Sequence, residues 1–265
     1  MQLSDLEPKL NVTNFSHIPF NNGASSIIVF NDGLTYPLGS KQRISAEYAR
    51  IMKLQNPGLA ELVYAGPANA AGAYAIAYGA LKNGLKATLF LSGTQIPENM
   101  KVLELSQNVS INVVRGNLET TNTKAAEYIA SKNETVPDSV MLVPFGGKDE
   151  LFMNLLYNSL VGDPQVQRLI SAQPKRIWLA TGSGTFLTVL MKLFPNTTFL
   201  AVQVSKSLPA ELAAKREVIA FWSPEKFSQP ARTPPPYPAM PNYDGKIWQF
   251  VLKHAQDGDL IWNIL

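Results

Sequence analysis

The residue best suited to covalent chemistry is Lys41, which ends a turn rich in glycine and proline, Asp32-Gly-Leu-Thr-Tyr-Pro-Leu-Gly-Ser-Lys41. Ser40 falls at a predicted N-cap, and we expect Lys41 in the first turn of a helix. The apolar residues that follow recur at helical spacing: Ile44, Tyr48, Ile51 and Met52. The positive end of a helix and the nearby Arg43 favour loss of the lysine proton, which a Schiff-base lysine requires. The alternative is a solvated lysine that only begins a helix.

A second stretch, Thr181-Gly182-Ser183-Gly184-Thr185, is suited to binding an anion. It follows an apolar strand and precedes an amphipathic helix. Glycines allow the backbone to approach a ligand closely, N–H groups at a helix start converge on an anion, and Ser183 and Thr185 add hydroxyl donors. A phosphate group fits this pattern, although the spacing is that of neither a P-loop nor a dinucleotide fingerprint. The alternative is a turn whose glycines serve only to reverse the chain.

A third stretch, Tyr64-Ala-Gly66-Pro-Ala-Asn69-Ala-Ala-Gly72, leads from a strand into a helix made almost entirely of alanine and glycine. Small side chains let such a helix pack closely on a neighbour. Asn69 is placed either to cap this helix or to bind a ligand. A fourth glycine turn, Pro144-Phe-Gly146-Gly147, also follows a strand. Glycine-rich strand ends in one parallel sheet point to the crevice at its carboxyl edge, where open α/β folds bind ligands.

These stretches are positioned by a repeated alternation of strands and helices. The strands are near-continuous apolar runs, as expected where helices cover both faces of a parallel sheet. The predicted strands are 26–30, 61–65, 86–92, 110–115, 139–143, 176–180, 198–204 and 259–264. Four predicted helices span 69–83, 123–132, 149–161 and 244–255. Three more are predicted by their ends: one begins at Lys41, one begins at Pro97, and one runs from Gly184 to Phe194. The predicted fold class is therefore α/β, with three αβα layers and open parallel sheets.

Two segments depart from this alternation. Residues 1–24 read as an irregular arm that ends in the turn Asn21-Asn-Gly. Residues 228–241 form a segment dense in proline, which forbids a helix or a central strand, and we expect a surface loop that closes over a site. Its prolines are Pro230, Pro234, Pro235, Pro236, Pro238 and Pro241.

Composition narrows the possible functions. The chain has 265 residues, of which 46% are hydrophobic and 16% charged, so it can bury a large core. A net charge of +3 without clustered basic residues does not indicate nucleic-acid binding. The absence of cysteine and the presence of only two histidines exclude disulfides, thiolate catalysis and a Cys- or His-rich metal site. No secretory or membrane-spanning segment is evident, and we expect a cytoplasmic protein.

The order of these stretches resembles the pyridoxal-phosphate enzymes of fold type II, the tryptophan synthase β-like group. Within that group the chain is most similar to the family of 1-aminocyclopropane-1-carboxylate deaminase and D-cysteine desulfhydrase. Gly39-Ser-Lys41-Gln-Arg43 resembles the family's Gly-Asn-Lys-x-Arg, and residues 143–147 resemble its Pro-x-Gly-Gly turn. Thr181–Thr185 resembles its phosphate cradle. The resemblance covers roughly residues 25–205, and Ala68-Asn69-Ala70 replaces the family's Ser-Asn-His/Gln.

This resemblance implies a cofactor and residue roles. Lys41 would be the catalytic lysine that forms a Schiff base with pyridoxal 5'-phosphate. The implied cofactor-binding residues are Asn69, Gly182, Ser183, Gly184 and Thr185. The implied substrate-binding residues are Ala70, Ala71, Gly72, Tyr237 and Tyr243. The candidates for the partner of the pyridine nitrogen are Ser205, Tyr237, Tyr243 and Asn263, and no metal is implied.

Three functions stay open at this point. The first is a lyase, deaminase or β-replacement enzyme that acts on a small amino acid. The second, favoured by the loss of the family's Ser and His, is a catalytically silent binding protein with the same fold. The third is an enzyme that acts on an amino group of a larger substrate, such as a modified nucleotide. The resemblance also implies a homodimer and two domains: a large one of residues 1–45 plus 145–265, and a small inserted one of residues 46–144.

Overall fold

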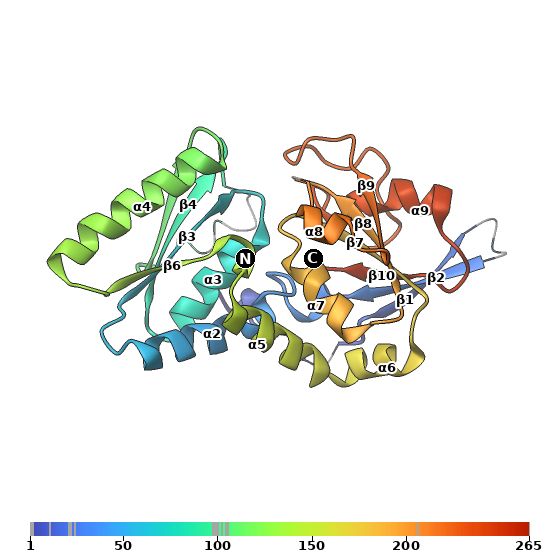
Figure 1. The fold of residues 1–265 in the computed structure, drawn as a ribbon, viewed down its shortest axis with the longest axis horizontal. Coiled ribbons are helices and arrows are strands. Elements are labelled where there is room, and N and C mark those ends of the chain that lie inside the picture. Colours follow the sequence, from blue (N-terminus) through green and yellow to red (C-terminus); the bar gives the residue numbers. More distant parts are fainter. Residues whose placement is uncertain are drawn as a thin grey trace. The chain divides into compact units, whose positions relative to one another are not determined.

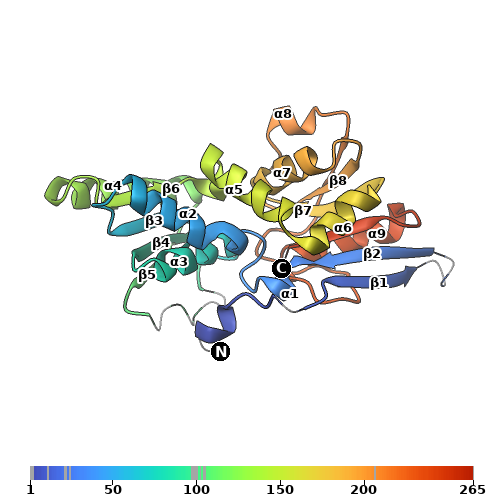
Figure 2. The same ribbon diagram turned by 90° about the horizontal axis from the view of Figure 1, so that it is seen from below.

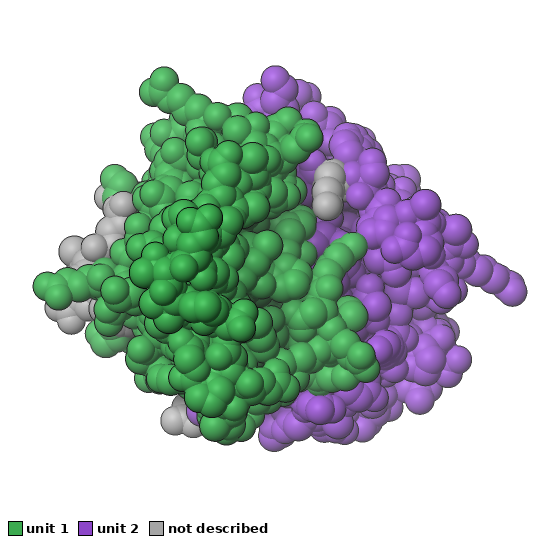
Figure 3. Space-filling view, turned by 60° about the vertical axis from the view of Figure 1, so that its left-hand side comes forward, with its two compact units in different colours: residues 1–7, 37–156 green, residues 8–36, 157–265 purple. Residues whose placement is uncertain are grey.

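The computed structural model describes residues 3–10, 12–20, 23, 25–96, 101, 103, 106–205 and 207–264. The chain forms two compact units, which are coloured separately in Figure 3. Unit 1 comprises Met1–Glu7 and Pro37–Leu156, and unit 2 comprises Pro8–Tyr36 and Tyr157–Leu265. The domain boundaries given above stay a prediction.

Unit 1 is built on a four-stranded parallel sheet in the order β5-β4-β3-β6. Helix α4 lies along one side of this sheet (Figure 1) and covers the face that carries Val63 and Ala65, which pack with its Ala125. The two central strands are apolar and almost completely buried, as expected for strands covered on both faces. The elements are η1 (Leu3–Leu6), α2 (Gln42–Gln55), β3 (Glu61–Pro67), α3 (Ala71–Lys82), β4 (Lys86–Ser92), β5 (Val109–Val114), α4 (Leu118–Thr135), β6 (Val140–Val143) and η4 (Phe145–Gly147). Helix α5 (Glu150–Val161) begins in this unit.

Helices α2 and α3 approach each other closely because α3 consists mostly of alanine and glycine. At Gly79 the approach is closest, since a Cβ atom there would lie 2.2 Å from the carbonyl oxygen of Ser45. Only glycine fits such a position without movement of the backbone. The predicted close packing of this helix is confirmed, and it fixes α2, whose first residues follow Lys41, against the sheet.

Unit 2 is built on a six-stranded sheet in the order β1-β2-β10-β7-β8-β9. All neighbouring strands are parallel except β1 and β2, the antiparallel pair that lies side by side in Figure 2. The elements are β1 (Phe15–Phe20), β2 (Ser25–Asn31), α1 (Asp32–Thr35), α6 (Pro164–Ala172), β7 (Arg176–Thr181), α7 (Thr185–Leu193), β8 (Thr198–Gln203), α8 (Ala210–Ala213), β9 (Val218–Trp222), η5 (Asp244–Ile247), α9 (Trp248–His254) and β10 (Leu260–Asn263).

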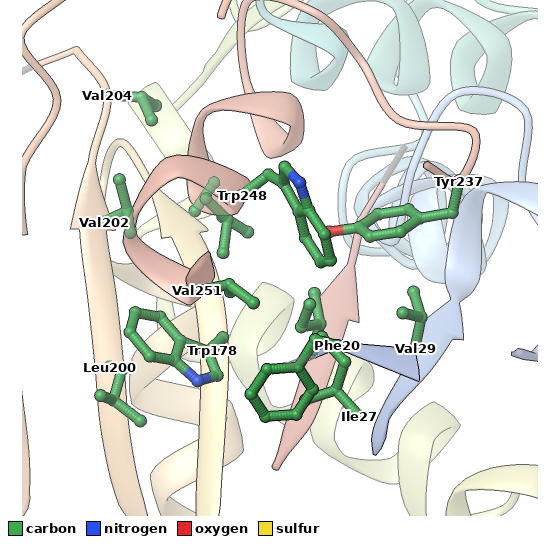
Figure 4. Packing of buried hydrophobic residues seen from close by; sticks show 13 residues of the cluster. Phe20, Ile27, Val29, Trp178, Leu200, Val202, Val204, Tyr237, Trp248 and Val251 are labelled. Atoms are coloured by element: carbon green, nitrogen blue, oxygen red, sulfur yellow. The ribbon is translucent and has the colours of Figure 1, made fainter. Parts of the chain in front are cut away.

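Aromatic side chains fill both faces of the unit 2 sheet. On one face Trp178 lies near Val251 of α9, and in the same cluster Tyr237 packs against Trp248, as Figure 4 shows. On the other face Trp262 makes edge contacts with Phe30 at 4.7 Å and with Phe186 of α7 at 5.6 Å between ring centroids. The sheet is therefore covered on both sides, and the prediction of three αβα layers with parallel sheets is confirmed.

The N-terminal segment is the main error of the strand prediction. Residues 1–24 were expected to be irregular, yet residues 15–20 form β1 and pair with β2. Pro19 is compatible with this strand because β1 lies at the edge of the sheet, where a missing N–H is tolerated. The predicted turn at Asn21-Asn-Gly includes Asn21 and Asn22, which lie outside the described residues, as does the predicted helix opening at Pro97.

Several other elements differ from the prediction. Helix α6 was missed although its start signal is in the sequence, since the Asp163 side chain accepts hydrogen bonds from the N–H groups of Gln165 and Val166 and Pro164 occupies the first turn. Helix α8 and strand β9 were also missed. The predicted helix 244–255 is divided into a 3₁₀ turn and α9.

The proline-rich segment contains no helix or strand, as predicted. A backbone bond closes the segment on itself, since the Ala231 N–H donates to the Pro241 carbonyl at 2.8 Å, and the Asn263 side chain of β10 donates to the Pro238 carbonyl at 2.8 Å. The Tyr237 side chain is buried and meets the Trp248 ring edge-on at 5.9 Å between centroids (Figure 4). The segment is thus anchored through Tyr237 in the hydrophobic core.

Candidate functional site

Lys41 occupies the N-cap of α2, one residue before the position predicted for it. Ser40 was predicted to cap the helix, but its hydroxyl is buried and has no hydrogen-bond partner among the described residues. The side chain of Gln42 stabilises the turn before the helix, because its Oε1 accepts the N–H of Leu38 at 2.9 Å. The turn is therefore held without the side chains of Ser40 and Lys41, which are left for other contacts.

Burial lowers the pKa of Lys41 from 10.5 to about 8. The predicted direction is correct, but the predicted cause is not. The helix end and Arg43 were expected to act through charge, whereas removal of the ammonium group from water is the cause. No ion pair or hydrogen bond joins the side chain of Lys41 to the rest of the described chain. Near neutral pH this amine is a nucleophile far more often than a solvated lysine is.

Gly72 and Tyr64 lie next to Lys41. A Cβ atom at Gly72 would lie 3.5 Å from Nζ of Lys41 and 3.5 Å from the hydroxyl oxygen of Tyr64. The missing side chain therefore leaves a small space that both functional groups face. Sequence reasoning predicted Lys41 and Gly72 as site residues, and the structure brings them together. It did not single out Tyr64, because a tyrosine within an apolar strand reads as a core residue.

The glycine turn after β6 holds Tyr64 in place. The N–H of Gly146 donates to the Tyr64 hydroxyl at 3.1 Å, within the buried part of unit 1. Gly146 and Gly147 have positive φ angles of 78° and 68°, which glycine adopts without strain. Burial raises the pKa of the Tyr64 phenol to about 12, against the opposing effect of the Gly146 hydrogen bond. The predicted turn at residues 144–147 is therefore bonded to β3 through the side chain of Tyr64.

Asn69 lies in the loop of residues 68–72, called here the asparagine loop, and it does not play one of the two roles predicted for it. The N-cap of α3 is Ala70, which has no side chain to cap with, so Asn69 does not cap this helix. The Asn69 side chain is half-buried, and within the described part of the chain it makes no hydrogen bond. Tyr74 closes the loop instead, since its hydroxyl donates to the Ala68 carbonyl at 2.6 Å. Ala70 and Ala71 offer no functional group beyond their backbone.

The second predicted group of residues lies in unit 2, between β7 and α7. Gly184 is the N-cap of α7 with a φ of 83°, and a Cβ atom there would lie 2.8 Å from Leu212. The hydroxyls of Ser183 and Thr185 are 3.1 Å apart. The N-cap Gly184 offers no side chain to cap this helix, and only the Thr185 N–H has a side-chain acceptor in the turn, the Ser183 hydroxyl at 3.4 Å, so the N–H groups that follow are left for an external acceptor. Together with the two hydroxyls they form a donor set suited to a phosphate.

Two of the four candidate partners for a pyridine nitrogen lie beside this turn. A Cβ atom at Gly182 would lie 3.1 Å from the Ser205 hydroxyl and 3.5 Å from the Tyr243 hydroxyl. The Asn263 side chain at the end of β10 donates to the Asn31 side chain at 2.7 Å and to the Pro238 carbonyl at 2.8 Å. Tyr237 points into the hydrophobic core toward Trp248, and its hydroxyl has no partner within the described residues.

The predicted site residues therefore form two groups. Lys41, Gly72 and the asparagine loop belong to unit 1, and residues 181–185 with Ser205 and Tyr243 belong to unit 2. No cluster of His, Cys, Asp or Glu suited to a metal occurs in the described residues. In the same residues no helix is long and apolar enough to cross a membrane.

Comparison with known proteins identifies the fold. No family model matches the sequence, and no curated protein sequence matches it. Among solved structures, a homologue of ACC deaminase superimposes with a TM-score of 0.75 at 16% identity, covering 99% of this chain and 92% of the other. The chain has the fold of the pyridoxal-phosphate enzymes of fold type II.

Two further structures support this fold assignment. An O-acetylserine-dependent cystathionine β-synthase from Helicobacter pylori superimposes with a TM-score of 0.66 at 14% identity, covering 99% of this chain and 94% of the other. A diaminopropionate ammonia lyase from Escherichia coli superimposes with a TM-score of 0.65 at 11% identity, covering 97% and 83%. At such identities the likeness shows the fold, and the predicted resemblance is confirmed at that level.

The residues of this fold type II chain fit pyridoxal phosphate. Unit 1 offers a lysine of lowered pKa and, beside it, the buried Ser40 hydroxyl without a partner among the described residues. Unit 2 offers a glycine turn with paired hydroxyls at the start of a nine-residue helix. A lysine and a phosphate cradle are what this cofactor needs from a protein.

Proposed function

We propose that this protein binds pyridoxal 5'-phosphate through Lys41 and acts as a lyase, deaminase or β-replacement enzyme on a small amino acid. The observation that supports this most is the lysine itself. Lys41 has a pKa of about 8 and faces the space left by Gly72. The Lys41 side chain is partly shielded from water and has no ion pair in the described part of the chain, an arrangement that is costly for a charged ammonium group. The fold and the phosphate-type donor set in unit 2 point to the same cofactor.

The chain's own residues have distinct tasks in this proposal. The cofactor, when bound, supplies an electron sink that stabilises negative charge on the substrate carbon next to the amine. Lys41 carries the cofactor at rest, and its free amine then takes the proton from that carbon. Residues 182–185 bind the phosphate, and the backbone of residues 69–72, at the start of α3, binds the substrate carboxylate. Ser205 and Tyr243, which lie together beside Gly182, are the preferred partners of the pyridine nitrogen.

A second candidate function is a binding protein that has kept the fold and the cofactor without turnover. It is favoured by the asparagine loop, in which Ala70 and Ala71 carry no group able to transfer a proton. Binding of the cofactor is common to both functions, and turnover separates them.

Absorbance spectroscopy of the purified protein with added pyridoxal phosphate tests the shared part. We expect the wild type and the exposed-lysine control Lys148→Ala to develop a saturable band above 400 nm that Lys41→Ala lacks. A band of equal intensity in Lys41→Ala would remove Lys41 from the proposal. Release of ammonia and a keto acid from serine, cysteine or β-chloroalanine, assayed as separate enantiomers, then distinguishes an enzyme from a silent binding protein.

A further inference from the structure

The Tyr64 hydroxyl shares one small space with the Lys41 amine. A single carbon atom placed at the Cβ position of Gly72 would contact both groups, at 3.5 Å each. All three residues belong to unit 1, and Tyr64 projects from β3 while Gly72 lies in the first turn of α3. Tyr64 is 2% exposed, so its hydroxyl is not a surface group that meets this space by chance.

The hydrogen bond from Gly146 uses the Tyr64 oxygen as an acceptor and leaves the Tyr64 proton for another partner. The backbone N–H of Gly146 donates to the phenolic oxygen at 3.1 Å, so the oxygen is an acceptor on that side. Its own proton has no acceptor among the described residues. A buried O–H group without an acceptor is unfavourable, and a ligand or the neutral amine of Lys41 in the shared space would supply one.

The loop of residues 68–72 has no hydroxyl side chain that could compete with Tyr64 as a proton donor. Ala70, Ala71 and Gly72 have no polar side chain, and the neighbouring Tyr74 hydroxyl is already bonded to the Ala68 carbonyl. Elimination of a poor leaving group needs a proton donor, and a positioned one contributes about 10²- to 10⁴-fold to the rate. In this loop and in β3, the side chain that places a hydroxyl next to Lys41 is that of Tyr64.

We propose that Tyr64 is the general acid that protonates the leaving group, an assignment that rests on the proposed lyase function. Lys41 Nζ takes the proton from substrate Cα, and the electron pair of that C–H bond forms the double bond to Cβ. The bond from Cβ to the leaving group breaks with its electron pair on the leaving group, which takes the Tyr64 proton. Lys41 then returns its proton to the Tyr64 oxygen. The products are an unsaturated amino acid and the protonated leaving group.

The first test needs neither cofactor nor turnover. In the protein without cofactor, the rate of Lys41 acetylation by acetic anhydride at pH 7 is measured by mass spectrometry. In this proposal the Tyr64 phenol donates to the neutral amine and so favours it over the ammonium form, and its removal in Tyr64→Phe should slow the reaction at pH 7 about threefold to tenfold. The control is Tyr128→Phe, which removes a hydroxyl of α4 that donates to Glu61, and it should not change the acetylation rate of Lys41. An unchanged rate in folded Tyr64→Phe would overturn the contact with Lys41.

A second variant keeps the test decisive if Tyr64→Phe does not fold. Incorporation of 3,5-difluorotyrosine at position 64 keeps the ring and the hydroxyl and makes the phenol a stronger donor. Lys41 should then react faster than in the wild type, and a rate equal to that of the wild type counts against the contact.

Leaving-group dependence tests the acid role in the cofactor-loaded protein. Chloride leaves without a proton, whereas hydroxide does not. Tyr64→Phe should therefore lower elimination from serine at least about 100-fold and elimination from β-chloroalanine of the same configuration less than threefold. Equal losses with both amino acids would overturn the acid role and leave the proposed function intact. If the wild type turns over neither amino acid, the proposed enzyme function fails, and the acetylation rates still decide whether Tyr64 contacts Lys41.

Discussion

The backbone carbonyl oxygen of Ser45 in α2 lies directly against Gly79 in α3, so close that only glycine fits at position 79. A Cβ atom at Gly79 would meet that oxygen at 2.2 Å and the Ser45 Cβ at 2.9 Å. This contact joins the helix that begins after Lys41 to the helix that begins beside Gly72. The lysine and the space it faces are therefore positioned by one tight helix pair.

Gly79→Ala should lower the free energy of unfolding by about 1 to 3 kcal/mol, because two backbones must move apart. This loss exceeds the gain of up to about 1 kcal/mol that alanine gives in a helix. Urea unfolding followed by circular dichroism measures the difference. Gly58→Ala is the matched control, since its Cβ would meet only the Asn56 side chain, at 3.5 Å, and we expect a change within about 0.5 kcal/mol. Equal effects of the two substitutions would contradict the close packing of α2 and α3.

Gly72 offers a different outcome, because a Cβ there makes ordinary contacts. Gly72→Ala should keep or slightly raise the stability of α3. Gly72→Leu should fill the space that Lys41 and Tyr64 share and lower the rate of Lys41 acetylation in the folded protein about tenfold or more. The comparison separates blockage of the space from unfolding. Undiminished Lys41 reactivity in Gly72→Leu would show that the lysine faces elsewhere.

The lowered pKa of Lys41 has a consequence for stability. The unfolded chain binds the Lys41 proton up to about pH 10.5, whereas the folded protein binds it only up to about pH 8. The buried lysine therefore lowers the free energy of unfolding by a constant amount below about pH 8, and this loss disappears as the pH rises from 8 to 10.5. Lys41→Met should raise the free energy of unfolding by about 1 to 3 kcal/mol at pH 7, and this gain should fade over that range.

Unfolding of the wild type and of Lys41→Met at pH 7, 9 and 10.5 measures this effect. Lys148→Met, at an exposed position, controls for the general effect of removing a lysine. A gain that is the same at every pH would mean that Lys41 is not a buried, easily deprotonated amine.

Two buried tyrosines should respond in opposite ways to loss of the hydroxyl. Tyr74→Phe leaves the Ala68 carbonyl without its 2.6 Å bond and should cost about 1 to 3 kcal/mol. Tyr237→Phe removes a buried hydroxyl that has no partner among the described residues, and it should leave stability unchanged or raise it. Thermal unfolding of both variants decides the matter. A loss in Tyr237→Phe as large as in Tyr74→Phe would show that the Tyr237 hydroxyl is bonded.

The sequence predicted the parts of this molecule that depend on local pattern. Strands such as β3 and β7 can be recognised as continuous apolar runs because both of their faces are buried. The turns after them can be recognised by their glycines. The strand β1 was missed because its burial pattern is irregular and it is paired only along one edge. Pairing with β2 is a long-range property that no local window contains.

The candidate site divides in the same way. Lys41 and residues 182–185 were predicted from residue type and position in a strand-to-helix turn. Tyr64 was not, because its role depends on Gly146, 82 positions later in the chain, and on the missing side chain of Gly72. The cause of the Lys41 pKa shift was likewise misassigned, since burial is set by the fold and charge is visible in the sequence.

Reductive trapping shows whether Lys41 is the residue that carries pyridoxal phosphate. The protein is incubated with pyridoxal phosphate at substoichiometric concentration, reduced with borohydride and digested, and the labelled peptides are identified by mass spectrometry. We expect one dominant label, on Lys41, and its loss in Lys41→Ala without transfer to Lys148. A label spread over exposed lysines, equal in the wild type and in Lys41→Ala, would contradict it and leave a fold type II protein without its cofactor lysine.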